Sequence, residues 1–511
     1  MNTPLKDEPF HFFMIRTSKA FYPLALSLLV TACGSIETEP PKSARDCFRD
    51  RNEQYSEVLS CYTSALRNTP STYNELPAES FLGVINRNFE LVSQDWSENP
   101  DLEPTPWKHS INIFIPEGAT SGRALLIVNN GISIPSRDVD VRPATDFDET
   151  NMLQIAKRTG MIVISIDNVP TQYLTYTDDG VPRREDSSVA HSWRLFMQSP
   201  KEKPFSSLHV PMVGSIVKAM DLAEKELQAF GIKKFVVAGT SKRGWATWLT
   251  AIADNRVEAI APFVIDILAM NDVMEHTKKS FGGNWPLAFH DYRSQGFTNL
   301  MNSEEAKPLY ELVDPLQYKD AHYRSRLSIP KYIVNASGDD FFPPDNSNFY
   351  YSDLPGIKTF RTTPNSDHAG IRKAVADSLV TMLNRISKEL PLPTAEIQID
   401  RKLENAEEKD SDMLTVRFSE EPVEVTRWVA VNPEARDFRH ACGIRYIPTA
   451  LPAQQTLTVT NPRPAAGWSS SFVEARFSDG FVVTTPVQIL PNTYPNSAPA
   501  DKDGFCKTIP G

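Results

Sequence analysis

The hexapeptide at residues 239–244 has residue types and spacing that suit nucleophilic catalysis. It reads Gly-Thr-Ser-Lys-Arg-Gly and stands directly between an apolar run, 235–238, and a helical run that begins near Arg243. A serine in such a tight strand-to-helix turn has its hydroxyl lifted above the sheet, and the following helix supplies amide donors for an oxyanion. Ser241 is therefore the candidate nucleophile, and the Lys242 backbone N–H is a candidate oxyanion donor.

The hexapeptide departs from the usual G-x-S-x-G pattern of a nucleophile turn. Its fifth position is Arg243, and the second glycine follows one residue later, at Gly244. The variant G-x-S-[KR]-x-G occurs in some carbohydrate-active esterases of this type, so we treat the departure as a variation. One alternative interpretation is an ordinary glycine-containing strand-to-helix turn, and another is a nucleophile turn whose geometry is spoiled by crowding from Arg243.

A nucleophilic serine needs an acid and a base. In hydrolases with a strand-to-helix nucleophile turn, these follow along the chain in the order Ser, then Asp or Glu, then His, and candidates for both follow Ser241 in that order. The apolar run 332–334 leads into a loop that contains Asp339 and Asp340. Asp339 is preferred because its D-x-x-x-P-P spacing resembles the acid loop of several esterases, and Asp340 stays open as the alternative. His368 stands after the strand-like run 358–362 and just before a helical stretch, where the general base belongs.

Other residues at the ends of predicted strands are candidates for the oxyanion site and for substrate contacts. Asn130 and Gly131 follow the run 124–128, in the loop expected to give the second oxyanion donor. Gln172 follows a later strand and is a candidate substrate contact, as is Trp285, although the aromatic residues around Trp285 can equally form a local core. The acidic pair 185–186 is typical of a helix N-terminus.

The elements that must position these residues follow an alternating pattern. Short apolar runs, typical of strands buried on both faces, occur at 124–128, 161–166, 235–238, 259–265 and 332–334. Helical spacing occurs between them, at 149–158, 211–230 and from 243 onward, and again at 370–390. The alternation predicts an α/β protein with a mainly parallel, doubly wound sheet, and with the Ser-Asp-His order it indicates the α/β-hydrolase fold.

Changes in the pattern of residue types along the chain predict the domain organisation. We expect a catalytic domain over 110–392, interrupted at about 268–326 by an aromatic-rich cap insertion. Residues 46–109 read as a helical and loop extension before it. After a Pro-Leu-Pro segment the pattern becomes short strands between turns, which predicts a small β-sandwich domain over 393–511.

The N-terminal region resembles an export signal. Two basic residues precede an apolar run, 21–30, that is too short to span a bilayer. The run ends in Val-Thr-Ala-Cys, which resembles a bacterial lipobox, so we expect a lipoprotein signal peptide at 1–32, lipid on Cys33 and a polar tether over 33–45. The expected location is the cell envelope, and Gly34 favours the outer membrane. The alternative is a plain signal peptide with an incidental cysteine.

Cysteine usage and net charge limit the remaining possibilities. Four cysteines remain after Cys33, and an even number in an exported chain predicts two disulfides. Cys47–Cys61 and Cys442–Cys506 is the economical pairing among the three possible. No CxxC or His-rich cluster indicates a metal site, and no cofactor is expected. The net charge of −11 argues against a nucleic-acid partner.

Several motifs between residues 90 and 390 occur in an order found in a known family. They are Ser-Gln-Asp-Trp at 93–96, Trp-Lys-His at 107–109, the 239–245 turn, Val-Asp-Pro at 313–315 and the 338–342 loop. Together they resemble the PhoPQ-activated pathogenicity-related proteins. The resemblance implies an α/β-hydrolase core with Ser241, Asp339 and His368 as the triad. The family loop often has Glu where this chain has Asp340, so the choice of acid stays open.

Three functions compete on this evidence. The leading expectation is a carboxylic ester hydrolase that acts on a small-molecule ester in the envelope or outside the cell, while its lipid holds it to the membrane. The second is an aminopeptidase-like serine peptidase, which needs acidic residues for the charged terminus of its peptide substrate. The third is a catalytically silent hydrolase-like scaffold used for binding or signalling in virulence, which the complete set of triad residue types disfavours.

Overall fold

The computed structural model describes residues 43–96, 102–103, 105–133, 140–400, 411–500 and 502–511. The predicted signal peptide, Cys33 and most of the predicted tether lie outside these ranges. None of the helices in the described ranges is both long enough and apolar enough to cross a membrane.

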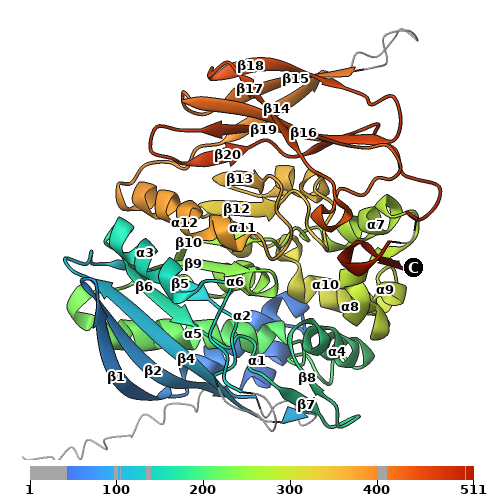
Figure 1. Ribbon diagram of the computed structural model, residues 1–511. Helices are drawn as coiled ribbons and strands as arrows, with labels where there is room; N and C mark the ends of the chain where they lie inside the picture. The colour runs from blue at the N-terminus through green and yellow to red at the C-terminus, as the bar shows by residue number, and fades with distance from the viewer. Residues whose placement is uncertain (1–42, 97–101, 104, 134–139, 401–410, 501) are drawn as a thin grey trace, which may run out of the picture. The chain divides into compact units, whose positions relative to one another are not determined.

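One nine-stranded sheet organises most of the chain, in the order β1-β2-β4-β6-β5-β9-β10-β12-β13 (Figure 1). Neighbouring strands from β6 to β13 pair in parallel, whereas β1, β2 and β4 are joined to the sheet by antiparallel pairings. The parallel part is the predicted doubly wound sheet. The strands are β1 (Thr72–Phe81), β2 (Val84–Asp95), β4 (Pro106–Pro116), β5 (Arg123–Val128), β6 (Ile162–Ile166), β9 (Lys234–Thr240), β10 (Val257–Phe263), β12 (Lys331–Ala336) and β13 (Lys358–Thr363).

Helices cover both faces of this sheet. Successive side chains of a buried strand point to opposite faces, so an apolar strand gives both faces apolar side chains that must be covered. In β9, Phe235 and Val237 join one buried cluster, and Val236 and Ala238 join another. The first cluster includes α1 (Ala44–Asp50), α2 (Val58–Arg67), α4 (Glu185–Gln198), α5 (His209–Glu226) and α6 (Lys242–Ala253). The second includes α3 (Glu149–Thr159) and α12 (Arg372–Ser387).

The segment before the catalytic domain differs from its prediction. Residues 46–109 were expected to form short helices and loops, but from residue 72 onward they contribute β1, β2 and the start of β4 to the main sheet. Nearly every side chain of β1 is exposed. A polar edge strand lacks the continuous apolar run that identifies a buried strand in sequence, which is the physical reason for the error.

Between β10 and β12 the chain forms a set of short helices that we call the cap. They are α7 (Met270–Ser280), α8 (His290–Ser294), α9 (Phe297–Leu300), α10 (Lys307–Val313) and α11 (Ala321–Leu327). A short strand within the cap, β11 (Trp285–Pro286), pairs with β22 (Thr508–Ile509) near the C-terminus. A small separate sheet joins β3 (Leu102–Glu103), β7 (Leu174–Tyr176) and β8 (Pro182–Arg183).

The C-terminal region contains two antiparallel sheets, as a β-sandwich requires. One has the order β14-β15-β18, and the other has the order β17-β16-β19-β20 with β21 beside β19. Inward side chains such as Val416 and Val473 share a buried cluster with α12, and β20 lies beside β13 (Figure 1). The strands are β14 (Ala395–Asp400), β15 (Ser411–Phe418), β16 (Glu424–Asn432), β17 (Ile447–Leu451), β18 (Thr456–Pro462), β19 (Trp468–Arg476), β20 (Val482–Thr484) and β21 (Gln488–Leu490).

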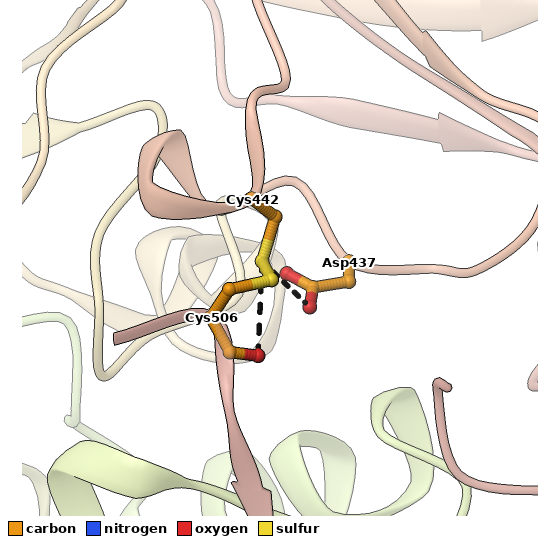
Figure 2. Close-up of side chains that lie close together, drawn as sticks. All are labelled: Asp437, Cys442 and Cys506. Atoms are coloured by element: carbon orange, nitrogen blue, oxygen red, sulfur yellow. Dashed lines mark hydrogen bonds between the residues drawn. A yellow bond between two sulfur atoms is a disulfide. The ribbon is translucent and has the colours of Figure 1, made fainter. Parts of the chain in front are cut away.

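Both predicted disulfides are present in the structure. Cys47 is bonded to Cys61, which joins α1 to α2, and Cys442 is bonded to Cys506 (Figure 2). The second bond links the segment before β17 to the segment that leads into β22. Because β22 pairs with the cap strand β11, this disulfide connects the C-terminal domain to the cap.

Candidate active site

Ser241 occupies the turn between β9 and α6. Its backbone has φ 53° and ψ −130°, which a non-glycine residue adopts only when the surrounding structure enforces it. The Ser241 N–H donates to the Phe263 carbonyl of β10 at 2.8 Å, and the Ser241 carbonyl accepts from the Trp245 N–H at 2.9 Å. The neighbouring strand and the following helix therefore hold the serine in the strained conformation of a nucleophile turn.

The two glycines of the turn are steric requirements. A Cβ on Gly239 would lie 2.7 Å from the backbone carbonyl of Arg243. A Cβ on Gly244 would lie 2.8 Å from the Gly239 carbonyl oxygen. Neither backbone can move without opening the turn. Gly244 therefore avoids a steric clash at its position, although the usual pattern places the second glycine one residue earlier.

His368 is hydrogen-bonded to Asp339. Its Nδ1 lies 2.9 Å and 3.0 Å from the two oxygens of the Asp339 carboxylate. Asp339 is buried, and its Oδ1 also accepts from the Phe341 N–H at 2.8 Å. An acceptor beside Nδ1 keeps the proton on that nitrogen, so Nε2 is left as the basic nitrogen. His368 and Ser241 line one pocket.

Asp340, the alternative acid, is in a different environment. Its Oδ1 is buried without a hydrogen-bond partner among the described residues. Burial, followed by repulsion from the Asp339 carboxylate, raises the pKa of Asp340 to about 6. Of the two acids that the sequence left open, Asp339 is the one that pairs with His368.

The pKa of His368 reflects two opposing influences. Burial lowers the pKa, whereas the charge and the hydrogen bond of Asp339 raise it. The second influence prevails, so the pKa of His368 lies above its ordinary value of 6.5. The imidazolium that a general base must form during proton transfer is therefore stabilised by its partner.

The C-terminal domain holds the two loops that carry Asp339 and His368. The His440 N–H donates to the Gly338 carbonyl at 3.0 Å, next to Asp339. Asn365, three residues before His368, exchanges two hydrogen bonds with the backbone of Tyr446, at 2.7 Å and 3.0 Å. Within the described residues the acid–base pair is thus supported from the β domain as well as from the main sheet.

Arg243 is accommodated by two carboxylates and does not stand free in the turn. It is 3% exposed, and its guanidinium donates to Glu185 Oε1 at 2.7 Å and to Asp146 Oδ2 at 3.3 Å. Asp146 also accepts from Thr240 Oγ1 at 2.6 Å and from Arg372 at 2.8 Å. These pairings compensate the buried charge of Arg243. They therefore stabilise the turn, whereas an unpaired buried cation would destabilise it.

Lys242 belongs to the same charge network. Its Nζ lies 2.8 Å from Glu185 Oε2 and 3.2 Å from Asp186 Oδ2. Burial raises the pKa of Glu185, but the charges of Arg243 and Lys242 outweigh it and lower that pKa to about 2. The acids at the start of α4 therefore do more than complement a helix N-terminus, which is the role that their sequence position favoured.

The predicted oxyanion residues have different surroundings. Lys242 is the first residue of α6, so its backbone N–H has no partner within the helix. Asn130 lines the pocket with Ser241, but its N–H donates to Asn129 Oδ1 at 3.1 Å. Gly131 is required for another reason than close approach to a ligand. A Cβ there would lie 3.1 Å from the Arg142 carbonyl oxygen and 3.2 Å from the Ala144 nitrogen.

The two predicted substrate contacts lie behind the pocket walls. Gln172 Nε2 donates to Glu185 Oε1 at 2.8 Å, and Gln172 Oε1 accepts from the Glu185 N–H at 3.3 Å. Trp285 is fully buried, with its ring 5.3 Å from that of Phe289. Gln172 therefore fixes Glu185, and Trp285 supports Phe289, which does line a pocket. Strand position indicated the correct edge of the sheet but not which layer of side chains faces the substrate.

Two pockets meet at Ser241, and we call them the apolar pocket and the polar pocket. The apolar pocket has a free volume of about 20 Å³, and the polar pocket has about 250 Å³. The apolar pocket is lined by Asp186, Trp193, Ser241, Lys242, Trp245, Ile265, Ile267, Met270, Met274, Phe289, Tyr292, Phe297, Phe341 and Phe342. The polar pocket is lined by Asn130, Asp146, Arg184, Glu185, Asp186, Thr240, Ser241, Lys242, Arg243, Val264, Phe341, His368, Ala369, Ile371 and Arg372.

Within the described ranges, two groups of side chains have the spacing of metal ligands. In the first, the sulfurs of Cys442 and Cys506 are joined to each other (Figure 2). Its third member, Asp437, pairs with Arg439 at 2.6 Å. In the second, Arg183 pairs with Asp179 and Arg194 with Asp178, and His191 Nε2 lies 3.0 Å from Asp178 Oδ1. Neither group presents free ligands, so neither supports a metal site.

Comparison with known proteins identifies relatives over most of the chain. The model of the PhoPQ-activated pathogenicity-related protein family matches residues 59–439. That range extends beyond the 90–390 region of the motifs on both sides and includes part of the C-terminal domain. The autocrine proliferation repressor protein A of Dictyostelium discoideum is 31% identical over 454 residues, which cover 83% of this chain and 87% of that protein.

Solved structures with a similar chain path include two esterases. The acetyl xylan esterase from Paenibacillus sp. R4 has a TM-score of 0.40 and 14% identity over 67% of this chain and 94% of that one. The glucuronoyl esterase from Solibacter usitatus has a TM-score of 0.38 and 11% identity over 61% of this chain and 86% of that one. By its sheet order, by the serine turn after β9 and by the extent of the family match, this chain is an α/β-hydrolase-fold member of the PhoPQ-activated pathogenicity-related protein family.

Proposed function

We propose that this protein is a serine hydrolase that cleaves carboxylic esters. Ser241 is the nucleophile, His368 the general base and Asp339 the group that orients His368. The observation that carries the proposal is the 2.9 Å bond between Asp339 and His368 Nδ1, in the pocket that the strained Ser241 lines. Fold alone does not indicate a reaction, but this arrangement at one edge of the sheet supports acyl transfer.

In the proposed reaction, Ser241 Oγ attacks the acyl carbon while its proton passes to His368 Nε2. The Lys242 N–H, at the start of α6, stabilises the oxyanion. The backbone N–H of Asn130 is the second donor, once it exchanges its bond to Asn129 Oδ1 for the oxyanion. Collapse of the intermediate breaks the bond to the alcohol oxygen, which takes the proton from His368. Water then repeats the sequence, releases the acid and restores Ser241.

The peptidase alternative has less support at this site. An aminopeptidase needs carboxylates that are free to bind a substrate ammonium group. Glu185 and Asp186 are suitably placed in the polar pocket, but Glu185 is bound by Arg243 and Lys242, and Asp186 is bound by Lys242 and by the Tyr292 hydroxyl at 2.9 Å. Ester hydrolysis makes no such demand.

A fluorophosphonate probe tests the proposal directly, because it reacts covalently with serines activated by a neighbouring base. We expect the wild-type protein to be labelled at Ser241 and the Ser241→Ala variant to remain unlabelled. Labelling of both proteins to the same extent would assign the reactivity to another residue. If neither folded protein is labelled, the scaffold interpretation replaces the enzyme.

We also propose that the protein is anchored to the cell envelope by lipid on Cys33, with the outer membrane favoured. The support is the lipobox-like sequence at residues 30–33. Expressed in a bacterium that processes lipoproteins, the wild-type protein should fractionate with membranes and incorporate labelled fatty acid, whereas Cys33→Ser should do neither. Cys442→Ser is no suitable control because it breaks a disulfide, so Thr38→Ala, within the same predicted tether, serves instead. A Cys33→Ser protein that stays with membranes would refute the anchor.

A further inference from the structure

The two pockets at Ser241 have different access to the base. Ser241 and Lys242 line both pockets, whereas His368 lines only the polar one. In ester hydrolysis the protonated base must reach the oxygen of the departing alcohol. The alcohol therefore leaves through the polar pocket, and the acyl group enters the apolar pocket.

The apolar pocket is the more confined of the two and favours a small acyl group. Its free volume of about 20 Å³ is less than a tenth of the 250 Å³ of the polar pocket. Aromatic rings packed on one another form much of its wall, together with two isoleucines and two methionines. The ring of Trp193 lies 5.0 Å from that of Phe297 and 5.4 Å from that of Trp245. Longer acyl chains would have to displace these rings, and closely packed interiors resist such movement.

The polar pocket is larger and carries a positive excess. Its lining has four cationic side chains against three carboxylates, with His368 neutral, so the net charge is +1. The carboxylates are already bound. Glu185 and Asp186 accept from Lys242, and Asp146 accepts from Arg243 and Arg372.

Arg184 accounts for the excess positive charge in the lining of the polar pocket. Among the described residues, no carboxylate pairs with it, and its guanidinium lies 5.9 Å from the ring centre of Tyr173. The residue is exposed at the pocket. Arg372 also lies partly open to solvent, with 43% of its side chain exposed. Two arginines that face solvent at one pocket favour an anionic group.

We infer that the preferred substrate is an acetyl or similarly short acyl ester of a polar alcohol that carries an anionic group. The inference rests on the proposed ester hydrolysis and specifies its substrate class. The acyl carbon lies at Ser241, the short chain lies in the apolar pocket, and the anionic part of the alcohol lies toward Arg184 and Arg372.

The acyl half of the inference is tested on the wild-type protein with 4-nitrophenyl esters, whose leaving group stays constant. We expect kcat/KM for the acetate to exceed that for the hexanoate at least about tenfold, because the longer chain meets the packed rings. A protein that is labelled by the fluorophosphonate but prefers the hexanoate, or does not discriminate, would overturn this half. If no ester is cleaved and no label is incorporated, the proposed function itself fails.

The alcohol half is tested with two acetyl esters that differ in one charge, 4-acetoxybenzoate and 4-acetoxybenzamide. We expect the wild-type protein to prefer the benzoate, and Arg184→Gln to reduce this preference about threefold to tenfold, measured as the ratio of the two kcat/KM values within each protein. Arg158→Gln removes the same charge on α3, where Arg158 pairs with Asp377, and should leave the preference unchanged. An equal preference in wild type and Arg184→Gln, or in both arginine variants, would overturn the assignment of the anionic site.

Discussion

Replacing Ser241 with alanine is expected to lower kcat for ester hydrolysis by about 10⁴-fold to 10⁶-fold. His368→Ala should cost a similar factor, and the double variant should be no slower than either single one. The reason is that the nucleophile and its base act as a unit, so that removal of one makes the other useless. The measurement is single-turnover kinetics on 4-nitrophenyl acetate, with circular dichroism to show that each variant is folded.

The matched control is Ser294→Ala, which makes the same change at an exposed position on α8. It should hydrolyse the ester at the wild-type rate. Losses that simply add in the double variant would show that Ser241 and His368 do not share a mechanism. A Ser241→Ala protein with undiminished turnover would remove Ser241 from the reaction altogether.

The strain at Ser241 adds a second readout to the same series. Its φ of 53° and ψ of −130° lie in a sparsely populated region that costs an L-residue about 1–3 kcal/mol and costs glycine little. Ser241→Gly should therefore be as inactive as Ser241→Ala but about 1 kcal/mol more stable to denaturant. Equal stability of the two variants would mean that the turn is relaxed in solution.

The core of the fold could be predicted because its strands are continuous apolar runs. The runs at 124–128 and 161–166 lie within one residue of β5 and β6, since strands buried on both faces need apolar side chains throughout. The strand β1 offered no such signal. Its side chains face solvent, and it includes Pro77 and three charged or amide groups that are typical of loops as well.

The proposed triad residues could be singled out because the order of nucleophile, acid and base along the chain is a property of the fold. The network around Arg243 was not found, because Asp146 and Arg243 are 97 residues apart and no local pattern marks their contact. One signal was nevertheless available. A buried arginine in the nucleophile turn requires a carboxylate partner, and Glu185, in the acidic pair 185–186, meets that need.

The support from the C-terminal domain was equally invisible in the sequence. Asn365 and Tyr446 are 81 residues apart, and their bonds involve the backbone of Tyr446, whose side-chain type does not enter the contact. Side-chain identity predicts contacts only where the side chain makes them. The β domain therefore had no deducible relation to the acid–base pair, although it holds the loop before His368.

Replacing Asp339 with asparagine is expected to lower the plateau of kcat/KM by about 10⁴-fold, as loss of the orienting carboxylate does in other serine hydrolases. It should also shift the pH profile. In the wild-type protein, the Asp339 carboxylate holds the pKa of His368 above 6.5, and activity falls when His368 is protonated. Without that carboxylate the effect of burial prevails, the pKa of His368 falls, and the acid limb of the profile moves to lower pH.

Asp340→Asn is the control that separates the two adjacent acids. It removes a carboxyl group of the same size one residue away, and Asp340 makes no hydrogen bond to His368 through its buried Oδ1. We expect less than about a tenfold loss of kcat/KM, because the charge on Asp340 influences His368 only through space. If Asp340→Asn abolishes activity and Asp339→Asn retains it, the orienting acid is Asp340, and the Asp339–His368 hydrogen bond is not the one used in catalysis. If both variants keep wild-type rates and the same acid limb, no carboxylate orients His368 and the triad mechanism fails.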